Sequence, residues 1–142
     1  MKQKVALSLT FLMSLLPMLL NQYGGHKGVQ EITGLINLLN PIGIMAVIMF
    51  VVGVWVPFKK QFIGKLLGAF GAMGIVVSEV YTFFTWYSLT ITGEISLQHS
   101  IRFAFPEFYF GLTISLVMVV AYFVIDRKLG NTPTSAPTDP QN

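Results

Sequence analysis

Glu79 is the residue of this chain whose type and position most directly suggest chemistry. It lies near the middle of the apolar segment 66–91, within the run IVVSEVY. An acidic side chain at the centre of a bilayer is costly, so such residues face the protein interior and have a partner or a function. Together with Ser78 and Thr82, Glu79 is a candidate site for a proton, a cation or a cationic substrate.

Two interpretations of Glu79 remain open. In the functional one, its carboxyl group binds the proton or cation. In the structural one, it is held by hydroxyl groups of neighbouring helices, for which Ser14, Thr113 and Ser115 are candidates. No Lys or Arg lies within any long apolar segment. The sequence therefore predicts no full ion pair inside the membrane.

A second set of polar residues is expected outside the membrane, in an outer vestibule formed by His26, His99, Arg102 and Glu107. The spacing of the two histidines and their neighbouring acids matches no established pattern of metal ligands, so we expect neither a metal nor a haem. Glu107 directly follows Pro106, and an acid in the first turn of a helix suits the positive end of the helix dipole. A membrane enzyme that uses His26, His99 and Glu107 is one functional alternative.

The motifs of common catalytic and cofactor sites are missing from the sequence. It contains no Gly-x-Ser-x-Gly, no His-Glu-x-x-His and no phosphate-binding Gly-Lys-Ser/Thr loop. The absence of cysteine excludes disulfides, thiolate metal sites and cysteine catalysis. We therefore predict no catalytic residues and no cofactor, and we favour a protein that is not an enzyme.

Small residues recur on one side of segment 66–91 and just before it. Gly64, Gly68 and Gly71 follow the spacing of one helical face, and Glu79 lies at the edge of the same side. Glycines on one face let two helix backbones approach closely. We expect this face to pack against another helix, either within the chain or in a homo-oligomer.

The composition places the chain in a membrane. Hydrophobic residues make up 54% of the sequence and charged residues only 11%, and the mean hydropathy is +0.68. A soluble domain carries about 25% charged residues. The net charge of +3 comes from basic residues at the ends of apolar runs, which indicates membrane topology and no binding of nucleic acid.

Four segments have the length and composition of membrane helices, at about 5–23, 35–58, 66–91 and 106–125. The predicted fold class is all-α: a four-helix transmembrane bundle over residues 1–128, with short interfacial helices on the outer side. We interpret the first segment as a retained helix because no cleavage site follows it. The proline-rich stretch 129–142 is expected to be a disordered cytoplasmic tail.

The distribution of basic residues predicts the orientation. With both termini in the cytoplasm, seven of the nine Lys and Arg residues lie on the inner side of the cell membrane: Lys2, Lys4, Lys59, Lys60, Lys65, Arg127 and Lys128. Aromatic residues mark the expected interfaces, with Trp86 at the outer one and Trp55 at the inner one. A short helix over 96–105 is expected on the outer surface.

These features favour a small multi-pass membrane protein that acts as a non-enzymatic accessory, regulatory or protective subunit through helix–helix contacts. The alternative is a small proton- or cation-coupled transporter or channel component that uses Glu79. The expected partners are the lipid bilayer and a homo-oligomer or a larger membrane complex. In outline the chain resembles the small multidrug transporters, but their acid lies in the first helix, which here has none. We therefore assign no family.

Overall fold

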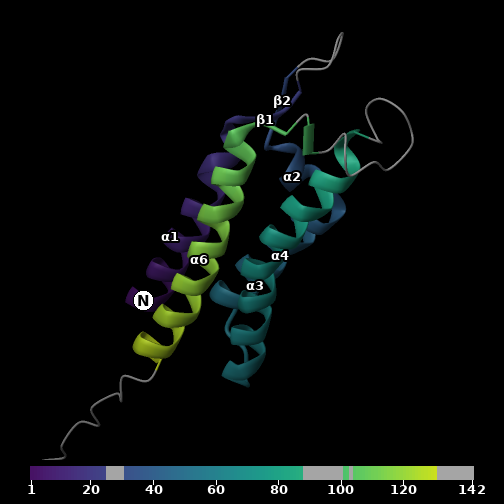
Figure 1. Ribbon diagram of the computed structural model, residues 1–142. Coiled ribbons are helices and arrows are strands. Elements are labelled where there is room, and N and C mark those ends of the chain that lie inside the picture. Colours follow the sequence, from purple (N-terminus) through teal and green to yellow (C-terminus); the bar gives the residue numbers. More distant parts are fainter. Residues whose placement is uncertain (25–30, 88–100, 103, 131–142) are drawn as a thin grey trace, which may run out of the picture.

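A computed structural model of the chain describes residues 1–24, 31–87, 101–102 and 104–130, and it is mostly helical (Figure 1). The helices are α1 (Lys2–Leu15), η1 (Leu16–Leu19, a 3-10 helix), α2 (Ile36–Leu39), α3 (Pro41–Trp55), α4 (Gln61–Tyr87) and α6 (Pro106–Gly130). Two short strands, β1 (Asn21–Tyr23) and β2 (Ile32–Thr33), pair antiparallel. The expectation of an all-α fold is confirmed.

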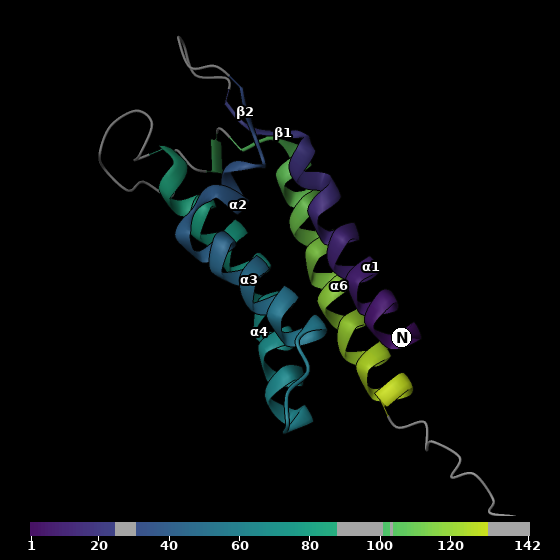
Figure 2. The same ribbon diagram turned by 180° about the vertical axis from the view of Figure 1, so that it is seen from behind.

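The long helices form two pairs, in which α1 packs along α6 and α3 packs along α4 (Figures 1 and 2). Between the pairs lies a core of buried side chains: Leu7, Phe11, Met18, Ala46, Phe50, Val54, Ala72, Ile75 and Tyr122. We call one end of the bundle the basic end; it contains the start of α1, the connection between α3 and α4, and the end of α6. The opposite end, which contains β1 and β2, is the strand end.

Glycines account for the close packing of α3 on α4. A Cβ atom at Gly53 would lie 2.2 Å from the backbone nitrogen of Gly68, and one at Gly64 would lie 2.9 Å from the carbonyl oxygen of Gly53. A Cβ atom at Gly71 would lie 2.4 Å from the backbone nitrogen of Phe50. Side chains at these positions would therefore force the two backbones apart.

The first helix ends earlier than the sequence predicts. A continuous helix was expected over 5–23, but α1 ends at Leu15, and η1 and β1 follow it. Pro17 lies inside η1 and has no N–H group, so the regular hydrogen-bond pattern of an α-helix cannot continue through it. The chain is extended at Leu20, with φ −84° and ψ 155°, and then enters β1.

The second predicted segment, 35–58, is also interrupted. Asn40 is extended, with φ −75° and ψ 159°, and separates α2 from α3. Its side-chain oxygen Oδ1 accepts a hydrogen bond of 2.8 Å from the backbone N–H of Gly43, and Pro41 occupies the first helical position. Asn40 is therefore the N-cap of α3, and its conformation is that of a residue preceding proline.

The other two segments are single helices with shifted ends. The helix predicted over 66–91 begins earlier, at Gln61, and the described part ends at Tyr87. The helix expected from Pro106 begins there and runs on to Gly130, so the first residues of the expected tail are helical. Residues 131–142 and most of the helix expected over 96–105 lie outside the described residues.

Among the described residues, two helices are long and apolar enough to cross a membrane by length and composition: Gln61–Trp86, with a mean hydropathy of 1.6, and Pro106–Gly130, with 2.3. The apolar helices α1 and α3 have only 14 and 15 residues. At 1.5 Å per residue each is about 22 Å long, shorter than a hydrocarbon core of about 30 Å. The four-helix transmembrane bundle is therefore not established by helix length.

The contact between α3 and α4 makes a prediction about stability. Gly53→Ala should lower the free energy of unfolding by about 2 kcal/mol, because the new methyl group overlaps the backbone of α4. Gly130→Ala is the matched control, since its Cβ atom would meet only the flexible ends of Lys65 and Gln3, at 2.9 and 3.3 Å. Thermal unfolding in detergent micelles measures both variants, and equal stabilities would contradict the tight packing.

Candidate functional site

Glu79 lies in the interior of the bundle. Its side chain is only 1% exposed, and the hydroxyl of Ser115, on α6, donates a hydrogen bond of 3.0 Å to its Oε1 atom. Its other oxygen, Oε2, is buried and has no hydrogen-bond partner among the described residues. An ionised carboxylate with so few partners is costly in apolar surroundings. The position therefore suits a carboxyl group that is neutralised by a proton or a cation.

Ser115 links Glu79 to a third helix. Its Oγ atom also lies 3.4 Å from the carbonyl oxygen of Ser14 in α1. A serine hydroxyl has one hydrogen atom, so it can donate to Ser14 or to Glu79 but not fully to both. Thr113, the other candidate partner, donates instead to Tyr109 of its own helix at 2.8 Å on the exposed face.

Ser78 and Thr82 contact Asn40 and not Glu79. The amide nitrogen Nδ2 of Asn40 lies 2.7 Å from Ser78 Oγ and 2.8 Å from Thr82 Oγ1. The hydroxyl of Ser78 donates a hydrogen bond to the carbonyl oxygen of Asn37. All three residues of the predicted proton or cation site are buried, but the structure divides them, with Glu79 facing α6 and the other two facing α2.

Two buried amide side chains, Asn37 and Gln22, extend this hydrogen-bond network, and the sequence analysis missed both. Asn37 donates to Gln22 Oε1 at 2.8 Å and accepts a hydrogen bond of 3.3 Å from the hydroxyl of Tyr23. Gln22 in turn donates to the carbonyl oxygen of Pro17 at 3.2 Å. Each amide lies close in sequence to a proline, at a helix interruption, which is the signal that could have indicated them.

Gly111 lets α6 approach this cluster. A Cβ atom there would lie 3.0 Å from Gln22 Nε2, 3.3 Å from Pro17 Cβ and 3.9 Å from Glu79 Oε1. The glycine therefore brings the backbone of α6 next to both the amide and the carboxyl group. We call Gln22, Asn37, Asn40, Ser78, Glu79, Thr82 and Ser115 the polar cluster.

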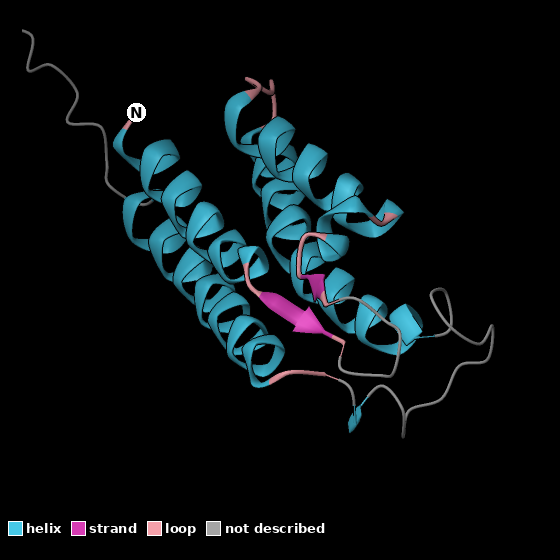
Figure 3. Cartoon of the chain, turned by 90° about the horizontal axis from the view of Figure 1, so that it is seen from above, coloured by secondary structure: helices cyan, strands magenta, loops and turns pink. Residues whose placement is uncertain are grey.

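Aromatic rings cover the polar cluster toward the strand end. Tyr23 stacks on Trp86 at 5.1 Å and contacts Phe108 at 5.5 Å between ring centroids, and all three are at most 2% exposed. Strand β1, which carries Tyr23, lies between the two helix pairs at this end (Figure 3). Trp86, expected at the outer membrane interface, is buried inside the bundle, and Trp55, expected at the inner interface, is half exposed.

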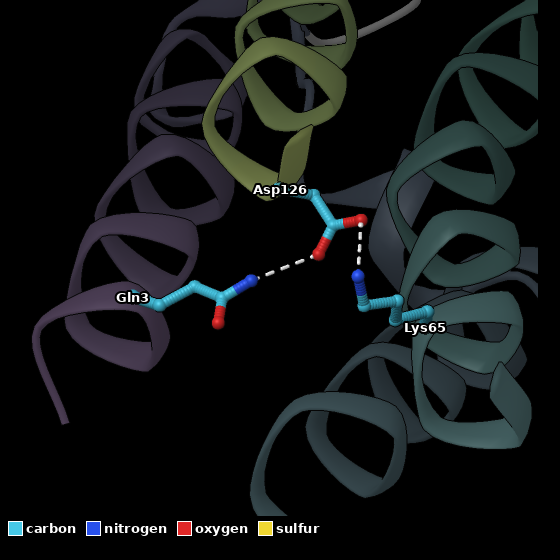
Figure 4. Close-up of polar contacts among 3 residues, drawn as sticks. All are labelled: Gln3, Lys65 and Asp126. Carbon is cyan, nitrogen blue, oxygen red and sulfur yellow. Dashed lines mark hydrogen bonds and ion pairs between the residues drawn. The ribbon is translucent and has the colours of Figure 1, made fainter. Parts of the chain in front are cut away.

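A second polar group lies at the basic end (Figure 4). Asp126 on α6 accepts a hydrogen bond of 2.9 Å from Gln3 on α1 and forms an ion pair with Lys65 on α4, with 3.6 Å between Oδ2 and Nζ. The three residues line a cavity of about 470 Å³ that also reaches Tyr122 and Gly64. The cavity extends from the basic end between the two helix pairs.

The remaining predicted positions are placed as follows. Gly64, Gly68 and Gly71 contact α3, and Gly68 also lies under the hydroxyl of Tyr122. Their face therefore packs within the chain.

The predicted outer vestibule is described only in part. Glu107, in the first turn of α6, and Arg102 are exposed at the strand end, but His26 and His99 lie outside the described residues. In the part that the structure describes, no three His, Cys, Asp or Glu residues are grouped as metal ligands would be.

Comparison with protein-family models, with curated proteins and with solved structures finds no match. The interpretation of the polar cluster therefore depends on its own geometry. Its members come from four separate segments of the chain and meet between the helix pairs.

The polar cluster predicts that two hydroxyl groups of α4 contribute differently to the free energy of unfolding. Ser78→Ala should lower the free energy of unfolding by about 1–3 kcal/mol, because it removes two buried hydrogen bonds, one from Asn40 Nδ2 and one to the carbonyl oxygen of Asn37. Thr85→Ala removes a hydroxyl that donates to Tyr81 of the same helix and should change the stability by less than about 0.5 kcal/mol. Denaturation of both variants in detergent measures the difference, and equal effects would argue against the network.

Proposed function

We propose that this chain is a small multi-pass membrane protein in which Glu79 binds a proton or a cation, as a component of a transporter or channel. The observation that carries the proposal is the buried carboxyl group: within the described ranges, its Oε2 atom has no hydrogen-bond partner and its Oε1 atom has one hydroxyl donor. Acidic residues inside membrane bundles commonly belong to ion or proton pathways. The polar cluster gives Glu79 a protein environment between helices, as such sites require.

The interrupted helices support four crossings of the membrane. With η1 added, α1 is about 29 Å long, and α2 and α3 together are about 28 Å long. Each therefore approaches the thickness of the hydrocarbon core. Irregular backbone at membrane depth is tolerated where it is buried in protein and hydrogen-bonded. The carbonyl oxygens of Pro17 and Asn37, at the two interruptions, accept hydrogen bonds from buried side chains.

Discontinuous helices are also where membrane transporters form their binding sites. Here both interruptions lie beside Glu79: Pro17 contacts Gly111 across the cluster, and Asn37 and Asn40 bond to Ser78 in the turn preceding the acid. The charged groups gather at the basic end, which we place in the cytoplasm together with both termini on the basis of the positive-inside rule.

A second role, as an accessory subunit of a membrane complex, is favoured by the surface of α6. Only 22% of the apolar window of α6 is buried within the chain, compared with 50% for α4. The exposed side chains include Phe110, Leu116, Val117, Val120 and Phe123. Lipid or a partner helix would cover this face. Because the glycine face of α4 is already occupied by α3, a partner helix would bind to α6.

The proposal predicts how one nearly isosteric substitution changes the rate of proton entry. In vesicles filled with a pH-sensitive dye and given a potassium diffusion potential, the full chain should admit protons, and Glu79→Gln should slow their entry at least about tenfold, because an amide cannot exchange the proton. Glu107→Gln is the matched control, since this acid is exposed in the first turn of α6. Equal rates for all three chains would remove Glu79 from the mechanism and leave the accessory role.

The membrane arrangement predicts which surfaces share a compartment. The chain has no cysteine, so single cysteines can be labelled without a background signal. Gln61→Cys and Lys128→Cys, both exposed at the basic end, should react with an impermeant thiol reagent from the same side of sealed membranes. Asn21→Cys, exposed at the strand end, should react only from the other side. Labelling of all three from one side would rule out the four crossings.

A further inference from the structure

Glu79 lies between two aromatic layers that differ in what lies behind them. Toward the strand end, Tyr23, Trp86 and Phe108 are closely packed and almost completely buried. Toward the basic end, Phe11 stacks on Phe50 at 3.8 Å, and Phe50 meets Tyr122 edge to face at 6.0 Å. The cavity of about 470 Å³ reaches this second layer. The cavity at the basic end therefore reaches the aromatic layer on that side of Glu79.

Tyr122 lies where the cavity meets a narrower space. It lines both the large cavity and a crevice of about 10 Å³, which is otherwise formed by Thr10, Phe11, Ser14, Ala72, Met118 and Val119. A space of about 10–15 Å³ on this measure holds about one water molecule. A hydrated ion does not fit into such a crevice, but a single water molecule that relays a proton does.

Ser14 and Ser115 connect the crevice to the acid. Ser14 lines the crevice, its carbonyl oxygen lies 3.4 Å from Ser115 Oγ, and the same hydroxyl lies 3.0 Å from Glu79 Oε1. The hydroxyl of Ser115 can therefore turn between an acceptor beside the crevice and the carboxyl group. Ser14 thus lies between the crevice, which shares Tyr122 with the cavity, and the hydroxyl group that donates to Glu79.

We propose that the ligand of Glu79 is a proton, exchanged with the basic end through the crevice beside Tyr122 and the hydroxyl of Ser115. This inference rests on the function proposed above and narrows it to one ligand and to the side from which Glu79 is reached in the described conformation. As Ser115 gives its proton to Glu79 Oε1, the Oγ–H bond breaks, and Oγ takes a proton from water in the crevice. The crevice water then regains a proton from water in the cavity, so one proton moves from the cavity to Glu79 and charge is conserved.

The surroundings of Glu79 favour a proton over a metal cation. Cations such as Ca²⁺ require six to eight oxygen ligands, whereas the described partner of the carboxyl group is one serine hydroxyl. Ser78 and Thr82, which could have added oxygens, are bonded to Asn40. Among the described ionisable groups, Tyr23 faces Glu79 from the strand end, and Lys65 and Asp126 line the cavity at the basic end.

The test is infrared measurement of hydrogen–deuterium exchange at the carboxyl group in the full chain. The carbonyl band of protonated Glu79 is identified as the band that is lost in Glu79→Gln. After transfer to D₂O, Ser115→Ala should slow the shift of this band at least about fivefold, the factor that corresponds to one hydrogen bond. Thr113→Ala is the matched control on the same helix, because its hydroxyl faces the exposed side, and it should leave the exchange rate unchanged.

The side of access is tested with two labelled cysteines. A bulky thiol reagent on Gln3→Cys, which lines the cavity, should slow the exchange relative to the unlabelled variant. The same label on Asn21→Cys, at the strand end, should have no effect. This comparison keeps Ser115 and Tyr122 intact, so a folding defect at either residue cannot produce the result.

Each outcome bears on one of the two proposals. Unchanged exchange in Ser115→Ala and in labelled Gln3→Cys, or slower exchange in labelled Asn21→Cys, would overturn the path from the basic end. A missing protonated band in the full chain would overturn the proton as ligand and leave the cation form of the proposed function. The proposed function itself fails only if Glu79→Gln and Glu107→Gln admit both protons and monovalent cations as the full chain does.

Discussion

The need to hydrogen-bond the backbone where two helices are interrupted organises the interior of this protein. Pro17 ends the regular helix after α1, and Asn40 with Pro41 separates α2 from α3. The carbonyl groups of Pro17 and Asn37 lie at these interruptions, in the interior, where an unpaired polar group costs several kcal/mol. Gln22, Asn40 and Ser78 satisfy these carbonyls, and their amides and hydroxyls bring polar chemistry into the core.

The glycines determine how near the helices come to that polar interior. Gly53 and Gly68 remove the side chains between α3 and α4, so the backbone of α3 lies against α4. Gly111 does the same for α6 beside Gln22 and Glu79. The close approach of α3 to α4 and the close approach of α6 to the polar cluster thus together hold the carboxyl group of Glu79 between the helix pairs.

The sequence predicted the parts of this arrangement that depend on local pattern. Apolar length and helical period predicted the helices α4 and α6 and placed Glu79 beside the glycine face. The period could not tell which helix the acid faces, and only the tertiary structure separates Glu79 from Ser78 and Thr82. Gln22 and Asn37 were treated as the ends of apolar segments, because nothing local shows that β1 returns across the bundle. Tyr23 on the same strand stacks on Trp86, whose burial the sequence did not predict.

The order of the helices along the chain has a consequence for how the fold is assembled. The hairpin of α3 and α4 joins neighbours in the sequence and can form as soon as both helices have been synthesised. The other pair joins α1 to α6, so α1 can first contact only α3, through the stacking of Phe11 on Phe50, and gains its main neighbour when α6 emerges. Ser14 on α1 then meets Ser115 on α6. The hydrogen bond from Ser115 to Glu79 therefore forms only after α6 has been synthesised, and a chain truncated before α6 would lack it.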